Sequence, residues 1–127
     1  MASVFELQDP NFGRLTKTRT VVAGDDAATT LTAAQCIESI ITVTPTTGRA
    51  YTTATGAAIL SELGINNKVG QSFEVTIVNL AASTHAITFT AGATGVTITG
   101  LATVAANTSA TFVGRVASSS AVVFYRK

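Results

Sequence analysis

The second half of the chain alternates apolar and polar residues with a period of two, and this alternation constrains the fold more than any other feature. In SFEVTIVN, residues 72–79, the pattern turns Phe73, Val75 and Ile77 one way and Glu74 and Thr76 the other. The segments THAITFTAG, GVTITG, LATVAANTSATFVGRV and AVVFYRK follow, with Gly, Asn and Ser between them. Short strands spaced by roughly 8 to 12 residues are typical of antiparallel sheets. The sequence therefore predicts an all-β fold, an antiparallel β-sandwich or barrel of the jelly-roll type.

Two short helices are expected before this region, near residues 32–38 and 56–63. DDAATT supplies capping side chains ahead of LTAAQCIESI, and Thr55 can cap the second helix through its hydroxyl group. Gly64 can end that helix in a left-handed conformation, which would bring Leu60 next to Ile65. Between the helices, IITVTP and RAYTTAT predict two strands that the turn TTG joins as a hairpin.

At 127 residues the chain is long enough for one hydrophobic core, and we divide it into an extended N-terminal arm, residues 1–23, and a single β-rich domain, residues 24–127. The arm contains Pro10 and Gly13 and has no sustained periodicity, although TVVAG at its end is typical of a short strand. We expect it to gain order against a partner; a terminus without any role is the alternative. Its candidate partner-binding residues are two aromatics and three cations: Phe5, Phe12, Arg14, Lys17 and Arg19.

Charge is scarce and unevenly placed. Charged residues make up 12% of the chain, the net charge is +1, and no Asp, Glu, Lys or Arg occurs from Val75 to Gly114. Because no run of Lys and Arg is present to neutralise phosphates, we expect no nucleic-acid partner. The start, MASVFELQDP, lacks the pattern of a secretion signal, and no segment approaches about 18 consecutive apolar residues. We therefore expect neither export by a cleaved signal nor a membrane partner.

The sequence offers few candidates for catalysis. Cys36 and His85 are the single cysteine and histidine, and His85 stands at the entry to a predicted strand. A half-buried or turn-adjacent histidine is favoured over a Cys-His dyad. Glu38, Glu62 and Glu74 are the carboxylates that a glycosidase pair would need, and each is better explained as a solvated or ion-paired surface group. We expect no enzymatic activity.

Metal and cofactor sites are not predicted either. Asp25 and Asp26 lack the regularly spaced oxygen ligands of a calcium loop, so a capped turn is the favoured interpretation. TAGATGVTITG is rich in glycine but has neither the GxGxxG spacing nor the following helix of a pyrophosphate site.

Three segments, LTAAQCIESIITVTPTTGRAYTTATGAAILSELG, VGQSFEVTIVNLAASTHAITFTAGATGVTITG and ATVAANTSATFVGRVASSSAVVFYRK, resemble small β-rich virion proteins of tailed bacteriophages. In such proteins a Thr-capped helix precedes a VGxSFxxxIVN strand, and Gly/Thr-rich hairpins follow. The resemblance covers about residues 31–126 and leaves the arm outside. It implies a head decoration, or cement, protein: a homotrimer on the outer surface of the virion capsid that binds the major capsid protein and stabilises the head.

Under this interpretation, neighbouring protomers cover much of the stretch from Val75 to Gly114, where charged groups would be costly to desolvate. Thr88 and Thr97 are test positions in it, and the pattern leaves their orientation open. The alternative function is a receptor-binding, fibre or tail module that grips a host glycan with its hairpin tips. Sugar rings stack on aromatic residues, and the predicted tips TTG, AGATG, AANTS and ASSS contain none.

Overall fold

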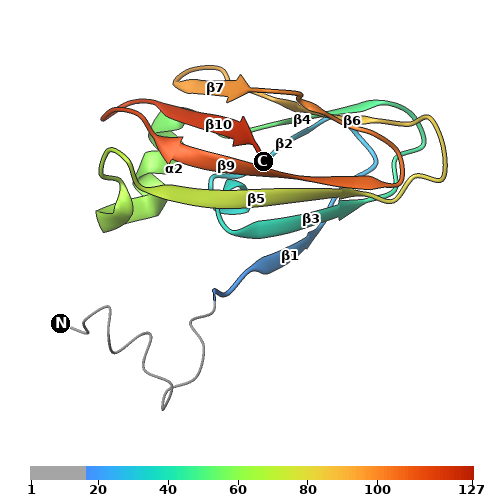
Figure 1. Cartoon of the computed structure of the whole chain (residues 1–127), viewed down its shortest axis with the longest axis horizontal. Helices are drawn as coiled ribbons and strands as arrows, with labels where there is room; N and C mark the ends of the chain where they lie inside the picture. The colour runs from blue at the N-terminus through green and yellow to red at the C-terminus, as the bar shows by residue number, and fades with distance from the viewer. Residues whose placement is uncertain (1–16) are drawn as a thin grey trace, which may run out of the picture.

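The computed structural model describes residues 17–127, and this part of the chain is mostly β-structure (Figure 1). It forms two sheets, one with the strand order β1-β3-β5-β9-β10-β7 and the other with the order β2-β4-β6-β8. The strands are β1 (Thr20–Ala23), β2 (Thr29–Thr30), β3 (Ser39–Val43), β4 (Arg49–Thr52), β5 (Ser72–Asn79), β6 (Ile87–Thr90), β7 (Val96–Thr99), β8 (Thr103–Val104), β9 (Thr108–Val116) and β10 (Val122–Arg126). The predicted β-rich fold is confirmed.

The prediction of antiparallel sheets is wrong, because both sheets are mixed. Strand β1 leads to β2, β3 to β4 and β5 to β6, and each of these units is an arch with one strand in each sheet. The arches stack in parallel: Val22 pairs with Ile41 and Ile41 with Ile77 in the larger sheet, while Tyr51 pairs with Phe89 in the smaller one. The predicted hairpin around TTG is therefore an arch between β3 and β4.

The stack of arches is covered on one side and open on the other. Strand β9 pairs antiparallel with β5, and β8 pairs antiparallel with β6, so the third arch is covered in both sheets. Strand β10 pairs antiparallel with β9, and β7 adds to β10 in parallel. On the open side, β1 and β2 are edge strands. Thr20–Ala23, the last residues of the predicted arm at 1–23, thus belong to the larger sheet as β1.

One of the two expected helical segments is an α-helix. Helix α2 (Gly56–Leu63) follows Thr55, whose hydroxyl oxygen accepts a hydrogen bond from the Ala58 N–H at 3.2 Å, so the predicted cap is confirmed. Near residues 32–38 the chain forms only the 3-10 turn η2 (Ala34–Cys36). In residues 17–127, no helix has the length and apolar character needed to cross a membrane.

The end of α2 differs from the expected helix stop. Gly64 has φ 60° and ψ −122°, so the chain leaves the helix without adopting the left-handed helical conformation. Ile65 lies in the following turn, η3 (Gly64–Asn66), with 87% of its surface exposed. So exposed a side chain does not pack on the helix, and the expected contact between Leu60 and Ile65 is wrong.

The inner faces of the two sheets share one hydrophobic core. Its centre is a series of aromatic rings from both sheets, with centroid distances of 5.6 Å for Phe73–Phe124, 5.3 Å for Phe124–Phe89 and 4.4 Å for Phe89–Phe112. The first two pairs meet edge to face, the geometry that aromatic quadrupoles favour. A Cβ atom on Gly114 would lie 2.5 Å from carbon atoms of the Phe73 ring, so the packing requires glycine there.

Buried Asn79 fixes the point where β5 leaves the larger sheet. Its Nδ2 donates to the carbonyl oxygens of His85 at 2.8 Å and Val104 at 3.0 Å, and its Oδ1 accepts from the Ala81 N–H at 3.0 Å. Asn79 is only 1% exposed, and all of these bonds are to backbone groups, so the buried side chain is fully paired.

Asp26 joins the loops of the first two arches. Its Oδ1 accepts from the Thr46 N–H at 3.0 Å and from Arg49 Nε at 2.9 Å, and its Oδ2 accepts from the Thr46 hydroxyl at 2.7 Å. These donors lie in the neighbouring arch. Asp26 therefore bridges two loops, where the sequence predicted a capped turn.

Candidate functional site

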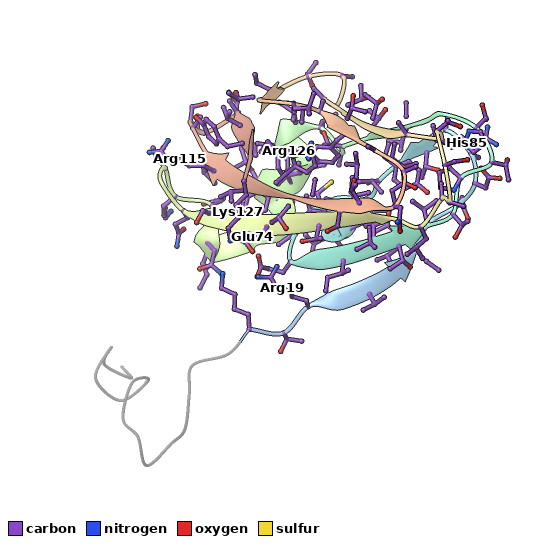
Figure 2. All side chains as sticks on the ribbon, turned by 45° about the vertical axis from the view of Figure 1, so that its right-hand side comes forward. Arg19, Glu74, His85, Arg115, Arg126 and Lys127 are labelled. Atoms are coloured by element: carbon purple, nitrogen blue, oxygen red, sulfur yellow. The ribbon has the colours of Figure 1, made fainter. Side chains whose placement is uncertain are left out.

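Five charged side chains meet where the N-terminal segment joins the outer face of the larger sheet. Glu74 on β5 is central: Arg19 Nη2 lies 2.8 Å from its Oε1, and Lys127 Nζ lies 3.2 Å from its Oε2. Glu38 lies beside it, with its Oε1 3.9 Å from Arg19 Nη2 and 3.7 Å from Lys17 Nζ. Figure 2 shows Arg19, Glu74 and Lys127 near one another, although they come from remote parts of the sequence. We call these five residues the arm-root cluster.

The register of the larger sheet assembles the arm-root cluster. Strands β3 and β5 pair in parallel with Ser39 opposite Val75, which makes Glu38 and Glu74, the residues just before them, neighbours. A hydrogen bond of 2.6 Å from the Glu74 N–H to Glu38 Oε2 fixes this contact. The Glu74 side chain points outward because it alternates with buried Val75 along the strand.

The two cations keep Glu74 ionised. Hydrogen bonds from Arg19 and then from Lys127 hold the pKa of Glu74 below its ordinary value of 4.5. A glycosidase acid needs the opposite perturbation, a raised pKa that retains its proton near neutral pH. Glu74 is therefore suited to anchoring the two cations and unsuited to donating a proton.

Glu38 combines a strained backbone with an unsatisfied oxygen. Its φ is +50°, a left-handed conformation that is costly for a residue other than glycine. Its Oε1 is shielded from solvent and accepts no hydrogen bond within residues 17–127. Buried polar atoms are normally paired, so this acceptor calls for an explanation.

Glu38 also lines a surface groove of about 400 Å³ at the beginning of β5. The other lining residues are Ile37, Leu63, Asn66, Gly70, Gln71, Ser72 and Phe73. We call it the Glu38 groove. Its lining combines apolar side chains, from Ile37, Leu63 and Phe73, with the neutral polar side chains of Asn66, Gln71 and Ser72. Glu38 Oε1 is shielded from solvent, so the surface that the groove offers is mainly neutral.

The predicted arm residues divide between the described and the remaining parts of the chain. Phe5, Phe12 and Arg14 lie outside the described residues. Lys17 and Arg19 both belong to the arm-root cluster, with 62% and 27% of their side chains exposed. Arg19 is thus held by the body of the protein, whereas most of the Lys17 side chain remains accessible.

The other candidate residues do not come together. Cys36 is completely buried, and burial raises the pKa of its thiol to about 11, which leaves it a poor nucleophile. His85 is half-buried in the turn before β6, as predicted, and Figure 2 shows it at the right-hand edge, away from Arg19, Glu74 and Lys127. Among residues 17–127, no group of three or more His, Cys, Asp or Glu side chains could hold a metal ion.

The uncharged stretch from Val75 to Gly114 contributes much of the exposed surface. Thr88 and Thr97 are both exposed in the single chain, which settles the orientation that the sequence left open. Leu80 and Leu101, in the loops after β5 and β7, are 54% and 65% exposed. The exposed side chains of this stretch are neutral and partly apolar, and the nearest charge beside Leu101 comes from β10, where Arg126 Nη1 donates to the carbonyl oxygens of Leu101 at 3.0 Å and Thr103 at 2.8 Å.

Comparison of the chain with protein families, with characterised proteins and with solved structures finds no match. Function must therefore be argued from the residues and their geometry.

Sequence reasoning missed the contact between Glu38 and Glu74. The two residues are 36 positions apart, and Glu38 fell at the end of a predicted helix, 32–38. Only the parallel register of β3 and β5 joins them. Parallel neighbours are linked by long connections that leave no local turn signal, so no feature of the sequence pointed to this pair.

Proposed function

We propose that this protein is a structural component of a phage virion, a decoration or cement protein that binds the major capsid protein on the outer surface of the head and stabilises it. In this role it catalyses no reaction and needs no cofactor. The observation that carries the proposal is the stretch without charged side chains from Val75 to Gly114, in which exposed threonines such as Thr88 and Thr97 accompany exposed Leu80 and Leu101. Surfaces of this composition suit coverage by other protein chains.

The same surface supports a homotrimer as the functional form. A protomer whose two sheets share one core has outward strand faces that neighbouring protomers can cover. Thr, Ser and Val on such faces pack against another chain without an unpaired charge. The mass of the isolated protein tests this part of the proposal and is discussed below.

The N-terminal arm is the proposed capsid-binding element. Burial of Phe5 or Phe12 in a pocket between capsid subunits would contribute on the order of 2 kcal/mol each. An exposed ion pair from Arg14 or Lys17 would contribute less than about 1 kcal/mol. The aromatics should therefore dominate affinity. Arg19, held by Glu74 at 2.8 Å, supports this role because it fixes the root of the arm to the centre of the sheet.

The decisive experiment is a pull-down on undecorated heads at two salt concentrations. One variant tested should lack the arm. Because Lys17 and Arg19 contact the body of the protein, this deletion should remove residues 2–16 only. We expect this variant to fold and assemble but not to bind heads. Phe5→Ala with Phe12→Ala should weaken binding more than Arg14→Gln with Lys17→Gln. If the truncated protein decorates heads like the wild type, attachment belongs to the β-domain.

The alternative, a fibre or tail module that binds a host glycan, receives less support from the surface. Among residues 17–127 the exposed large aromatic side chain is Tyr125, which is 43% exposed. It lies opposite Val113 on a sheet face and not on a loop tip. Copy number separates the two functions, since a decoration protein is present hundreds of times per particle and a fibre only a few times.

A further inference from the structure

We propose that the loop between α2 and β5, residues 64–71, docks the domain on an acidic part of the capsid surface. Ile65 and Val69 are its apolar contacts, and Lys68 and Arg115 are its ionic contacts. This inference rests on the proposed function and adds a second contact to that of the arm. The partner surface carries carboxylate groups next to an apolar side chain. We call residues 64–71 the α2–β5 loop.

The α2–β5 loop holds two large aliphatic side chains in water. Ile65 is 87% exposed, more than any other large apolar side chain in residues 17–127, and Val69 is 63% exposed. The loop lies at the same end of the molecule as α2 (Figure 1). Two such side chains in one short loop are typical of a surface that contacts another protein.

The loop also borders two grooves. Lys68 and Val69 line a groove of about 240 Å³ that reaches Ser119, in the connection between β9 and β10. Gly70 and Gln71 line the Glu38 groove. Side chains of a partner can therefore enter these grooves while the partner contacts the loop itself.

Hydrogen bonds hold the loop in its conformation. The Lys68 N–H donates to Gln71 Oε1 at 3.1 Å, and the Gln71 N–H donates to the Lys68 carbonyl oxygen at 3.0 Å. Two further bonds of 2.9 Å join the loop to β9, from the Gly70 N–H to the Val116 carbonyl oxygen and from the Val116 N–H to that of Gln71. Because the loop is already ordered, binding costs it little conformational entropy.

Two exposed cations accompany the apolar side chains. Lys68 precedes Val69 directly, and Arg115 approaches the loop from β9, since a Cβ atom on Gly70 would lie 3.6 Å from its Nη2. Figure 2 shows Arg115 at the left-hand side of the domain. Neither Lys68 nor Arg115 forms an ion pair with a residue in 17–127. Charge complementarity therefore favours an acidic partner.

A second copy of the chain matches this charge poorly. Most carboxylates in residues 17–127 already contact cations of their own chain: Asp26, Glu38 and Glu74. The stretch from Val75 to Gly114, which is the proposed contact between protomers, contains no carboxylate. The acidic surface that complements the loop is therefore assigned to the capsid.

Binding of full-length variants to undecorated heads, titrated at two salt concentrations, tests the loop separately from the arm. We expect Ile65→Ser and Val69→Ser each to weaken binding about tenfold, because an apolar contact is lost. Val21→Ser is the matched control for Val69→Ser, since Val21 is 67% exposed but lies on β1. It should bind like the wild type.

A second pair of variants tests the charges. Lys68→Gln with Arg115→Gln should weaken binding at low salt and reduce its dependence on salt. Lys68→Arg with Arg115→Lys keeps both charges and should bind like the wild type. Equal binding by these two double variants would overturn the ionic contacts.

The remaining outcomes separate this inference from the proposed function. If the wild type does not bind heads, the proposed function is wrong and the docking is wrong as well. If the wild type binds and Val69→Ser binds no more weakly than Val21→Ser, the docking alone is wrong. A lower oligomer mass for Ile65→Ser in light scattering would also overturn it, because a second copy would then cover the loop.

Discussion

Asn79 is the polar side chain on which the core depends most directly. Asn79→Leu keeps the volume but leaves the carbonyl groups of His85 and Val104 and the N–H of Ala81 without their partners. We expect the free energy of unfolding to fall by about 3 kcal/mol, measured by chemical denaturation. Asn66→Ala, at an exposed position, should change it by less than about 0.5 kcal/mol. A loss below about 1 kcal/mol for Asn79→Leu would contradict the assigned network.

The stability of the core also depends on Gly114, because aromatic rings pack directly against it. In Gly114→Ala the new methyl group would meet the rings of Phe73 at 2.5 Å and Phe124 at 2.9 Å, so the aromatic cluster must shift. We expect a loss of about 2 to 3 kcal/mol in the free energy of unfolding. Gly48→Ala is the matched control, because its Cβ atom would have its nearest contact at 3.8 Å. Equal stability of the two variants would contradict this prediction, because it would show that the aromatic rings can move aside for a methyl group at little cost.

Asp26 makes the stability of the fold depend on pH in the acidic range. Hydrogen bonds from the Thr46 hydroxyl, the Thr46 N–H and Arg49 lower the pKa of Asp26 from 3.8 to about 2. A carboxyl group with a lowered pKa stabilises the fold above its unfolded pKa, and this contribution is lost as the pH falls through the folded pKa. We therefore expect Asp26→Asn to flatten the decline in stability between about pH 4 and pH 2, measured by thermal unfolding. An unchanged decline in the Asp26→Asn variant would contradict this assignment.

At the scale of elements, the parallel pairing of β1 with β3 determines which N–H groups of β1 point toward β3. The N–H groups of Thr20 and Gly24 donate to Glu38 and Thr42, so Val22 also turns its N–H toward β3 and Val21 turns its own to the open edge. Val22→Pro should therefore reduce the free energy of unfolding by at least about 1 kcal/mol more than Val21→Pro. Denaturation of both variants tests this, and the reverse order would contradict the register.

The sequence predicted those elements whose signals are local. The alternation in β5 places Phe73, Val75 and Ile77 in the core, and the Thr55 cap begins α2, because neighbouring residues determine both features. The assignment of each strand to a sheet depends on distant residues and was not predicted. The arches also leave no repeat in the sequence, since Thr20 pairs with Ser39 and Ser39 with Val75 at unequal spacings.

The candidate site was predicted in part for the same reason. Lys17 and Arg19 stood out as cations beside a segment without periodicity, which is a local feature. Their intramolecular partners, Glu38 and Glu74, required knowledge of how β3 and β5 pair. The positive φ of Glu38 depends on the path of the chain between η2 and β3, and no residue type in that segment predicts it.

At the scale of the whole molecule, the exposed threonines test assembly. Thr97 is exposed on the edge strand β7. Thr97→Asp should therefore leave the stability of a protomer nearly unchanged and lower the mass of the oligomer in solution. Light scattering should give about three times 12.9 kDa for the wild type and a smaller mass for the variant. Thr88→Asp makes the same test on β6. A wild-type mass of one protomer at micromolar concentration would contradict the proposed trimer.

The position of Arg19 also determines how the protein would carry a mechanical load. Tension applied through residues before Lys17 would enter at β1, an edge strand whose hydrogen bonds to β3 could open one at a time. The Arg19–Glu74 ion pair offers a second path that bypasses β1 and β3 and reaches β5, whose two neighbours hold it in the interior of the sheet. Force is thereby shared between the edge and the centre of the sheet, and the rate of forced unfolding should depend on the charge at position 74 even where the equilibrium stability does not.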